Sequence, residues 1–366
     1  MPPYQQPRVR TEHAPYRHRG EIRLASIPPL ADAYPDDPWL WTLLEALDGT
    51  RTPDQAIDRV RNHHPEVPAD LIAKAIEELT WAGHLEDAAD DPGPAVPGTD
   101  SERYDRQIQY WRMVKPHDDR SAWQVQQSLS KRVVTIIGVG GAGVAAAYAL
   151  AASGVGLHLI DPDLVELSNL SRQLLFTRRD IGQFKTRAAV DHLRRLNPGV
   201  TITCADGSVT HGDGFKNNMI TSDLTILAGV EPHTLLPAAN RAAVESRSVW
   251  IDTGYHGPVV STTLYAPDTA TACWECLRRA DATQSGLGDL TGEDLVRALP
   301  RPLGQNAPAT AITAMLAGTY AAHAALAHLT GTSPWPAGAV LQHNLITNTQ
   351  RTITHPRDTA CPACAR

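Results

Sequence analysis

A glycine-rich turn constrains the fold more than any other feature of this 366-residue chain. Before it, the run Val133–Ile137 predicts a buried parallel strand, because it is short, β-branched and almost entirely apolar. The turn itself completes a G-x-G-x-x-G pattern with Gly138, Gly140 and Gly143. An alanine-rich helix over 141–153 and a second strand ending at Asp161 follow. A strand, a glycine turn and a helix in this order predict a loop that holds a phosphate at the helix N-terminus.

Strand and helix patterns continue to alternate beyond this turn. Strands are predicted at 133–137, 157–160, 200–204, 224–228 and 249–252. Helices are predicted near 141–153, 183–196 and 234–246. This alternation predicts a doubly wound, mostly parallel, Rossmann-like α/β sheet. The segments 259–266 and 339–354 are typical of antiparallel strands that extend it, and the uncharged run 307–330 is typical of a buried helix.

The sequence predicts four regions of different character. Residues 1–20 are expected to form a flexible arm, and residues 21–87 a small α+β domain. The stretch 88–101, "AADDPGPAVPGTDS", is rich in Pro, Gly and Asp without apolar periodicity, which is typical of a linker. Residues 102–366 are expected to form one α/β domain.

The small domain is predicted to resemble a winged helix-turn-helix, with three short helices and flanking strands. The second helix opens "TPDQAIDRV", where Thr52 and Gln55 have the spacing of a capping box. The third, "ADLIAKAIEELTW", carries Lys74 but three acidic residues, Asp70, Glu77 and Glu78. Because a DNA recognition helix needs cations for phosphates, this helix favours peptide binding instead.

The net charge of the chain limits the classes of molecule that it is expected to bind. The formal charge is −7, which argues against nucleic acid or an anionic membrane as the main partner. The basic N-terminal stretch lacks the apolar run of a signal peptide, and the run 307–330 is too weakly apolar to span a bilayer. We therefore expect a cytoplasmic protein.

Four of the five cysteines form two equally spaced pairs. The pairs are Cys273-x-x-Cys276 and Cys361-x-x-Cys364, with 84 residues between them. Two such pairs can supply the four thiolates of a tetrahedral structural zinc site, although redox-active or free thiols are the alternative. The fifth, Cys204, is expected in the core on a strand.

The residues after the second strand bear on which nucleotide the loop binds. NAD and ATP fit the glycines equally, with the helix amides beginning at Gly141 facing the phosphate and Asp161 accepting from ribose. ATP carries more charge and needs cations and Mg²⁺. Polar and basic residues follow closely: Asp163, Asn169, Arg172, Gln173 and Lys185. Two arginines, Arg103 and Arg106, precede the first strand. This set favours ATP.

Together, "RYDRQ", "GVGGAG", "DPDLVELSNLSRQLLF", "DIGQFK" and the cysteine pairs resemble the ThiF/MoeB/HesA family of adenylyltransferases, which are related to ubiquitin-activating enzymes. The resemblance covers about 102–366 and implies a homodimer that uses ATP and Mg²⁺ to adenylate a C-terminal carboxylate. It implies that Asp161 holds ribose, that Arg106 reaches the γ-phosphate of the partner subunit, and that the four paired cysteines bind zinc. The residues implied to hold the phosphates are Asn169, Arg172, Gln173 and Lys185.

The chain departs from the family pattern at the magnesium position. The family places Asp followed by Asn after a later strand, whereas this chain has Glu231 and Pro232. Glutamate can bind Mg²⁺ but is one methylene longer. Catalysis is expected to depend on charge stabilisation by Arg106, Arg172 and Lys185 with the metal. The chain has no cysteine between Cys276 and Cys361, where the family's crossover loop lies, so no thioester on the enzyme is expected.

Two substrates are open within the family: a ribosomally made precursor peptide, as in the microcin C maturation group, or a ubiquitin-like sulfur-carrier protein. The small domain resembles a PqqD-like precursor-recognition element, which favours the peptide and natural-product biosynthesis. Two alternative functions lie outside adenylate transfer: the protein is an NAD-dependent oxidoreductase, or it is a catalytically inactive binding scaffold.

Overall fold

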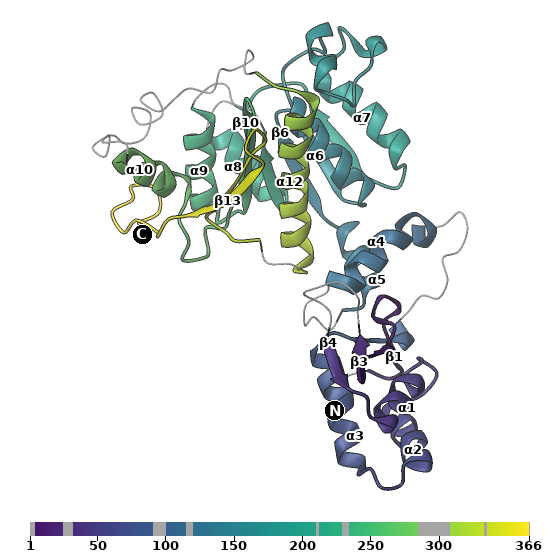
Figure 1. The fold of residues 1–366 in the computed structure, drawn as a ribbon. Helices are drawn as coiled ribbons and strands as arrows, with labels where there is room; N and C mark the ends of the chain where they lie inside the picture. The colour runs from purple at the N-terminus through teal and green to yellow at the C-terminus, as the bar shows by residue number, and fades with distance from the viewer. Residues whose placement is uncertain are drawn as a thin grey trace. The chain divides into compact units, whose positions relative to one another are not determined.

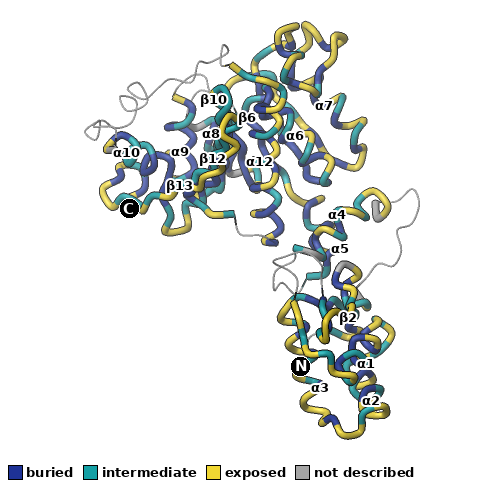
Figure 2. The backbone as a smooth tube through the Cα atoms, viewed as in Figure 1, coloured by how far each residue is buried: buried dark blue, intermediate teal, exposed yellow. Residues whose placement is uncertain are grey.

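The computed structural model describes residues 4–24, 32–90, 100–114, 120–209, 212–228, 234–284, 308–332 and 335–365. The chain divides into two compact units, 1–127 and 128–366. Figure 1 shows the course of the chain through both, and Figure 2 the buried faces of their helices and strands.

The second unit is built on an eight-stranded sheet in the order β13-β12-β11-β10-β9-β6-β7-β8. Its strands are β6 (Val133–Ile137), β7 (Gly156–Ile160), β8 (Ile202–Ala205), β9 (Leu224–Leu227), β10 (Trp250–His256), β11 (Val259–Tyr265), β12 (Ala339–Asn344) and β13 (Thr349–Thr354). The first five pair in parallel, and β10 to β13 pair antiparallel. The predicted doubly wound fold with an antiparallel extension is confirmed.

The parallel strands change direction of winding between β6 and β9. From β6 the chain runs outward through β7 and β8, then returns to the other side of β6 as β9 and β10. In open α/β sheets the ligand binds beside such a point, at the carboxyl ends of the strands. The glycine turn follows β6 and therefore lies there.

Helices cover the two faces of this sheet. They are α6 (Gly141–Ala152), α7 (Lys185–Leu196), α8 (Gly212–Thr221), α9 (Leu235–Ser246), α10 (Trp274–Gln284) and α12 (Ala311–Thr330). The buried side chain of Trp250 packs in one cluster with residues of α8, α9 and α10. Thr253, three residues further along β10, points to the opposite face and donates from Oγ1 to the Ala317 carbonyl of α12 at 2.8 Å. The glycine-rich start of α8 gave no helix prediction from the sequence.

Helices α6 and α12 approach each other unusually closely. A Cβ placed on Gly318 would lie 2.2 Å from the Ala142 carbonyl oxygen and 2.7 Å from the Ala146 nitrogen. Only glycine fits at this crossing. The capping box of Thr310 and Thr313 and the left-handed Gly331 fix the two ends of α12. Within the predicted run, residues 311–330 thus form a helix with just over half of its residues buried, and no helix in the described ranges has the length and apolar content to cross a membrane.

The first unit contains two small sheets and five α-helices among its described residues. Strand β1 (Pro7–Val9) pairs with β5 (Leu85–Asp87), and β3 (Glu21–Leu24) lies between β2 (Tyr16–His18) and β4 (Asp32–Pro35). The helices are α1 (Pro38–Ala46), α2 (Pro53–His63), α3 (Ala69–Trp81), α4 (Asp100–Val114) and α5 (Ala122–Leu129), whose last two residues lie beyond the division. The capping box of α2 forms as predicted, with Thr52 accepting from Gln55 N–H at 3.3 Å.

Within the stretch 1–20, expected from the sequence to be a flexible arm, the described residues from 4 onward supply β1 and β2. Strand β2 forms a local hairpin with β3, whereas β1 pairs with β5 nearly 80 residues later, a non-local effect that a local sequence pattern does not reveal. Buried Arg10 adds a bond from its Nε to the Leu85 carbonyl at 3.2 Å.

Helix α4 belongs to this unit through a half-buried carboxylate. Glu86 on β5 accepts from Arg8 Nη2 at 2.6 Å and lies 3.2 Å from Arg112 Nε of α4. Helix α5 joins through Gln126, whose Oε1 accepts from Trp111 Nε1 at 2.9 Å. The boundary expected at 101–102 stays a prediction.

Candidate active site

The glycine turn has the conformation that a phosphate loop requires. Gly138 adopts φ +93°, and a Cβ on Gly143 would lie 1.8 Å from the Gly138 carbonyl oxygen. The first helical bond of α6 runs from Val144 N–H to Gly140 O, so the amides of the first turn have no partner in the helix. These amides and the positive end of the helix dipole form an anion site.

Asp161, at the end of β7, is fixed against this turn. Its Oδ2 accepts from Val139 N–H at 2.6 Å, and its Oδ1 accepts from Asp163 N–H at 2.8 Å. Burial raises the pKa of this carboxyl, whereas Lys185 and the two amide bonds oppose that shift. A carboxylate can accept about four hydrogen bonds, so Asp161 retains capacity for a hydroxyl group beside the turn.

Lys185 supplies a nearly buried cation at the same edge of the sheet. It is the first residue of α7, its side chain is 8% exposed, and Nζ lies 2.7 Å from Asp163 Oδ2. Its backbone N–H also donates to the Asp163 carbonyl at 3.0 Å. The ion pair holds the ammonium close to the groups that support the turn, where it can turn from one exposed carboxylate toward an arriving phosphate.

The short helix η3 (Leu167–Ser171) and the residues after it carry the remaining predicted nucleotide ligands. Buried Asn169 caps this helix, with its Oδ1 accepting from Glu166 N–H at 3.0 Å. Half-buried Arg172 donates from Nη1 to the Ser168 carbonyl at 3.1 Å. Asn169 and Arg172 therefore have local structural bonds, and a bound phosphate would compete for the guanidinium.

Gln173 gives the most direct sign that the turn holds a ligand. The side chain is only 2% exposed, and its Nε2 lies 3.9 Å from a Cβ placed on Gly140. Its Oε1 is buried and has no hydrogen-bond partner among the described residues. Because an unpaired buried oxygen costs about 1–3 kcal/mol, a polar ligand at this point would remove a penalty. The glycine turn and this oxygen together fit a nucleotide.

Two predicted catalytic residues lie elsewhere or outside the described residues. Arg106 is on α4 in the first unit, and its side chain is 97% exposed, 3.9 Å from Asp105. Glu231 lies outside the described residues, so the expected magnesium position has no structural description. The site residues brought together within the second unit are Gly138, Gly140, Gly141, Gly143, Asp161, Asp163, Gln173 and Lys185.

Sequence reasoning missed Tyr255. A Cβ placed on Gly141 would lie 3.0 Å from the Tyr255 hydroxyl, so this phenol lies against the first turn of α6. It comes from the end of β10, which extends beyond the strand predicted at 249–252. The signal in the sequence was an aromatic donor at the carboxyl end of a parallel strand, the edge where ligands bind.

The four paired cysteines form one buried cluster. Their Sγ atoms all lie within 4.8 Å of one another, with Cys273 3.7 Å from both Cys276 and Cys361. Cys276 and Cys364 are 3.5 Å apart. These separations are too long for disulfides, and they match the roughly 3.8 Å edge of a tetrahedron with metal–sulfur bonds of about 2.3 Å. Cys204 lies apart on β8.

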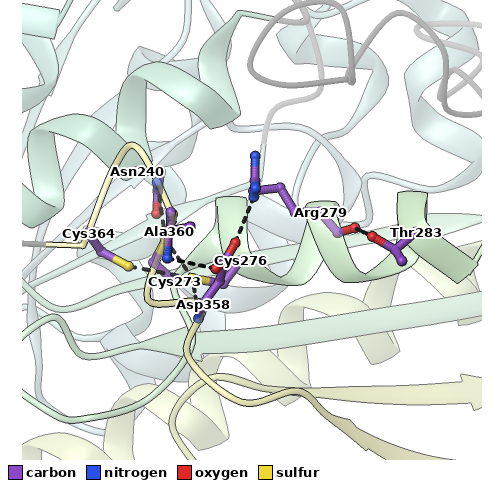
Figure 3. A network of polar contacts seen from close by, with 9 residues as sticks. Asn240, Cys273, Cys276, Arg279, Thr283, Asp358, Ala360 and Cys364 are labelled. Atoms are coloured by element: carbon purple, nitrogen blue, oxygen red, sulfur yellow. Dashed lines mark hydrogen bonds and ion pairs between the residues drawn. The ribbon is translucent and has the colours of Figure 1, made fainter. Parts of the chain in front are cut away.

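Neighbouring groups fix the sulfur positions (Figure 3). Asp358 N–H donates to the Cys276 sulfur at 3.4 Å, and Asn240 Nδ2 lies 3.7 Å from the Cys273 sulfur. The Asp358 carboxylate accepts from Arg279 Nε at 2.7 Å, which ties the C-terminal segment to α10. Burial raises the pKa of the Cys361 thiol to about 12. Because buried thiolates are costly alone, a bound cation is the natural partner of this donor set.

The fold and these two sites define a nucleotide-binding α/β unit carrying a four-cysteine cluster. The chain belongs to the ThiF family, whose model matches residues 104–363. The match begins within α4, at the second residue of "RYDRQ", and continues through the second unit to residue 363.

Two curated bacterial relatives are adenylyltransferases. The chain is 34% identical to the sulfur carrier protein ThiS adenylyltransferase of Escherichia coli K12, over 48% of this chain and 66% of that protein. It is 28% identical to the molybdopterin-synthase adenylyltransferase of the same organism, over 72% of this chain and 96% of that protein. The matched region thus spans just under two thirds of the first relative.

Solved structures share the fold over nearly the entire chain. The E. coli MccB structure has a TM-score of 0.78 at 18% identity and covers 98% of this chain and 96% of MccB. MccB bound to ATP gives a TM-score of 0.75 at 19% identity and covers 98% and 99%. PaaA gives a TM-score of 0.69 at 22% identity and covers 94% and 98%. The first unit as well as the second therefore has counterparts in these folds.

Proposed function

We propose that this protein adenylates the C-terminal carboxylate of a ribosomally made precursor peptide, using ATP and releasing pyrophosphate. The observation that carries the proposal is the buried Gln173 side chain beside Gly140, whose Oε1 has no hydrogen-bond partner within the described part of the chain, with the Lys185 ammonium at the same edge. The ThiF family membership and the adenylyltransferase relatives support the reaction class.

Each residue of the site has a role in charge stabilisation. The amides of α6 hold phosphate oxygens, Asp161 accepts from a ribose hydroxyl, and Lys185 moves from Asp163 to a phosphate. Asn169, Arg172 and Gln173 complete the phosphate contacts. Mg²⁺, held in part by Glu231, would supply further positive charge on the phosphates.

The reaction itself needs no covalent bond to the protein. A carboxylate oxygen of the peptide bonds to the α-phosphorus while the bond to the leaving pyrophosphate breaks, giving an acyl-adenylate. The protein contributes in-line positioning and stabilises the charge on the leaving group. No thioester is expected, because four of the five cysteines form one buried cluster and Cys204 lies apart on β8.

The peptide is favoured over a carrier protein by the first unit. This unit has its own hydrophobic core, to which α1, α2 and α3 contribute, and α3 is acidic. The chain resembles MccB over 98% of its length, and one solved form of that enzyme of microcin C7 biosynthesis is in complex with N-formylated MccA. A sulfur-carrier protein is the second candidate, on the identity to the ThiS adenylyltransferase.

A peptide would add to an edge of the small sheet β2-β3-β4 and lie against α3. Backbone hydrogen bonds at a sheet edge give affinity, and pockets for alternate side chains give selectivity. Tethering would then raise the local concentration of the reacting carboxylate at the catalytic site.

The test is pyrophosphate exchange into ATP in the presence of a candidate peptide or carrier protein. Lys185→Ala should lose about 100-fold or more of this exchange, because it removes a buried cation from developing charge. Lys131→Ala is the matched control, since Lys131 is exposed and precedes β6 at its amino end. Equal pyrophosphate exchange in the wild type, Lys185→Ala and Lys131→Ala would contradict the proposal. Hydride transfer with NAD would contradict it as well.

The proposal includes a homodimer, a structural zinc ion at the four cysteines, and a cytoplasmic location. In the dimer, Arg106 reaches the partner's phosphates. Mixing Arg106→Ala with Lys185→Ala subunits should then restore part of the activity, because one of the two shared sites is complete. Absence of rescue under proven subunit exchange would contradict a shared site.

A further inference from the structure

Tyr255 lies where three parts of the second unit meet. It is near the end of β10, and its ring packs with Ala142 of α6, Val260 of β11 and Ala317 of α12. This packing fixes the ring from several sides. The hydroxyl therefore has a defined direction, toward the start of α6.

The hydroxyl lies beside the first turn of α6. A Cβ placed on Gly141 would lie 3.0 Å from the Tyr255 hydroxyl and 3.6 Å from the Arg172 carbonyl oxygen. Gln173, with its unpaired Oε1, adjoins the preceding Gly140. A donor, an amide side chain and the helix N-terminus thus converge on two consecutive glycines.

Among the described residues, none forms a hydrogen bond with the Tyr255 hydroxyl. Tyr320, which packs against the same apolar cluster, has two hydrogen-bond partners. The Tyr320 hydroxyl accepts from Gln350 Nε2 at 2.8 Å and lies 3.1 Å from His343 Nδ1. Tyr320 is thus bonded as a structural tyrosine is. Tyr255 presents a free phenolic donor at the edge of the sheet where the nucleotide would bind.

The position of Asp161 indicates which phosphate this donor meets. Asp161, the ribose acceptor, is bonded to Val139 N–H, one residue before Gly140. The phosphate joined to the ribose is the α-phosphate, so it lies nearest to Gly140 and Gly141. A phenol in contact with Gly141 is then within reach of a non-bridging oxygen of that phosphate.

We infer that Tyr255 donates a hydrogen bond to the α-phosphoryl group, the centre at which the peptide carboxylate attacks. The inference rests on the proposed function and deepens it by adding a substrate-contacting residue. The bond strengthens as negative charge accumulates on the α-phosphoryl oxygens in the transition state.

The test compares Tyr255→Phe with Tyr320→Phe in the full-length protein. Both variants lose one hydroxyl from the same apolar cluster, so thermal unfolding of each checks that the fold is intact. Direct titration measures the dissociation constants of ATP, AMP and adenosine without any peptide. A hydrogen bond to a charged group contributes about 1.5–3 kcal/mol, which corresponds to roughly a 10- to 100-fold change.

Tyr255→Phe should weaken both ATP and AMP by about tenfold or more and leave adenosine unchanged, because adenosine lacks the α-phosphate. With a peptide acceptor, kcat should fall further. Tyr320→Phe should match the wild type. Unchanged ATP and AMP affinity in Tyr255→Phe, or an equal loss for adenosine, would overturn the role of Tyr255 alone. Failure of the wild type to bind ATP would overturn the proposed function itself.

Discussion

The four-cysteine cluster permits a quantitative prediction. Serine in place of Cys361 removes one of four sulfur ligands from a site whose Sγ atoms lie within 4.8 Å of one another. Zinc there would close a loop of 84 residues between Cys276 and Cys361. By loop-closure entropy, a cross-link over such a length stabilises the folded state by about 4–5 kcal/mol.

The expected loss follows from that figure. For a unit of this size, 1 kcal/mol shifts the melting temperature by about 2–4 °C, so a loss of this size should lower the melting temperature of Cys361→Ser by about 8–20 °C. Its zinc content should fall from about one ion per chain to near zero, as measured by mass spectrometry of the metal. Cys364→Ser should behave in the same way, because the proposed zinc site would need all four cysteines.

Cys204→Ser is the matched control. Cys204 lies on β8 outside the cluster and is only half-buried, so its replacement should leave the zinc content unchanged and the melting temperature within a few degrees. Well-folded wild-type protein without zinc would refute the reasoning. So would a Cys361→Ser variant that melts at the wild-type temperature.

Two further predictions concern stability. Gly318→Ala should destabilise the protein by about 1–2 kcal/mol, because overpacking against the Ala142 carbonyl costs about 1–3 kcal/mol and removing a helical glycine returns at most about 1 kcal/mol. Chemical denaturation measures the free energy of unfolding of each variant. Gly207→Ala is the control, since nothing lies within 4 Å of a Cβ placed on Gly207. Equal stability of the two variants would contradict the close crossing of α6 and α12. Burial raises the pKa of Asp252 to about 6 against the opposing effect of Arg278, so its protonated form stabilises the fold below about pH 4 and this contribution is lost as the pH rises through 6. Asp252→Asn should therefore be up to about 2–3 kcal/mol more stable than wild type at pH 8 and equal to it at pH 4; lower stability at pH 8 would show that attraction to Arg278 outweighs burial.

The parallel part of the sheet could be predicted from the sequence because each strand is a short apolar run that ends at a turn. Val133–Ile137 and Leu224–Leu227 are both of this kind, and every residue of the second is buried. The start of α8 could not be predicted, because Gly212 and Gly214 weaken the helix propensity that a local pattern detects. Tertiary packing overrides propensity there, and Phe215 is fully buried in the core.

The candidate site was predictable only in part, for a similar reason. The glycine turn, Asp161 and Lys185 are close in sequence to one motif, and the fold places Asp161 against Val139 and Lys185 against Asp163. Tyr255 is more than a hundred residues from Gly141, and only the pairing of β10 with β9 brings it to the turn. Its role depends on strand order, which a local sequence pattern does not contain.

The carboxylate of Glu86 has a consequence for transferring substrate recognition between enzymes. Because it contacts both Arg8 of β1 and Arg112 of α4, the helix that carries Arg106 is part of the same compact body as the small sheets. A chimera that grafts residues 1–87 onto a foreign catalytic domain would leave this half-buried carboxylate short of one cation. A graft of residues 1–127 keeps all three side chains and carries the arginine helix with it. The segment to be exchanged is thus residues 1–127, which is larger than the small domain predicted at 21–87. An enzyme that receives this segment also receives Arg106, the arginine proposed to act in the active site of the partner subunit.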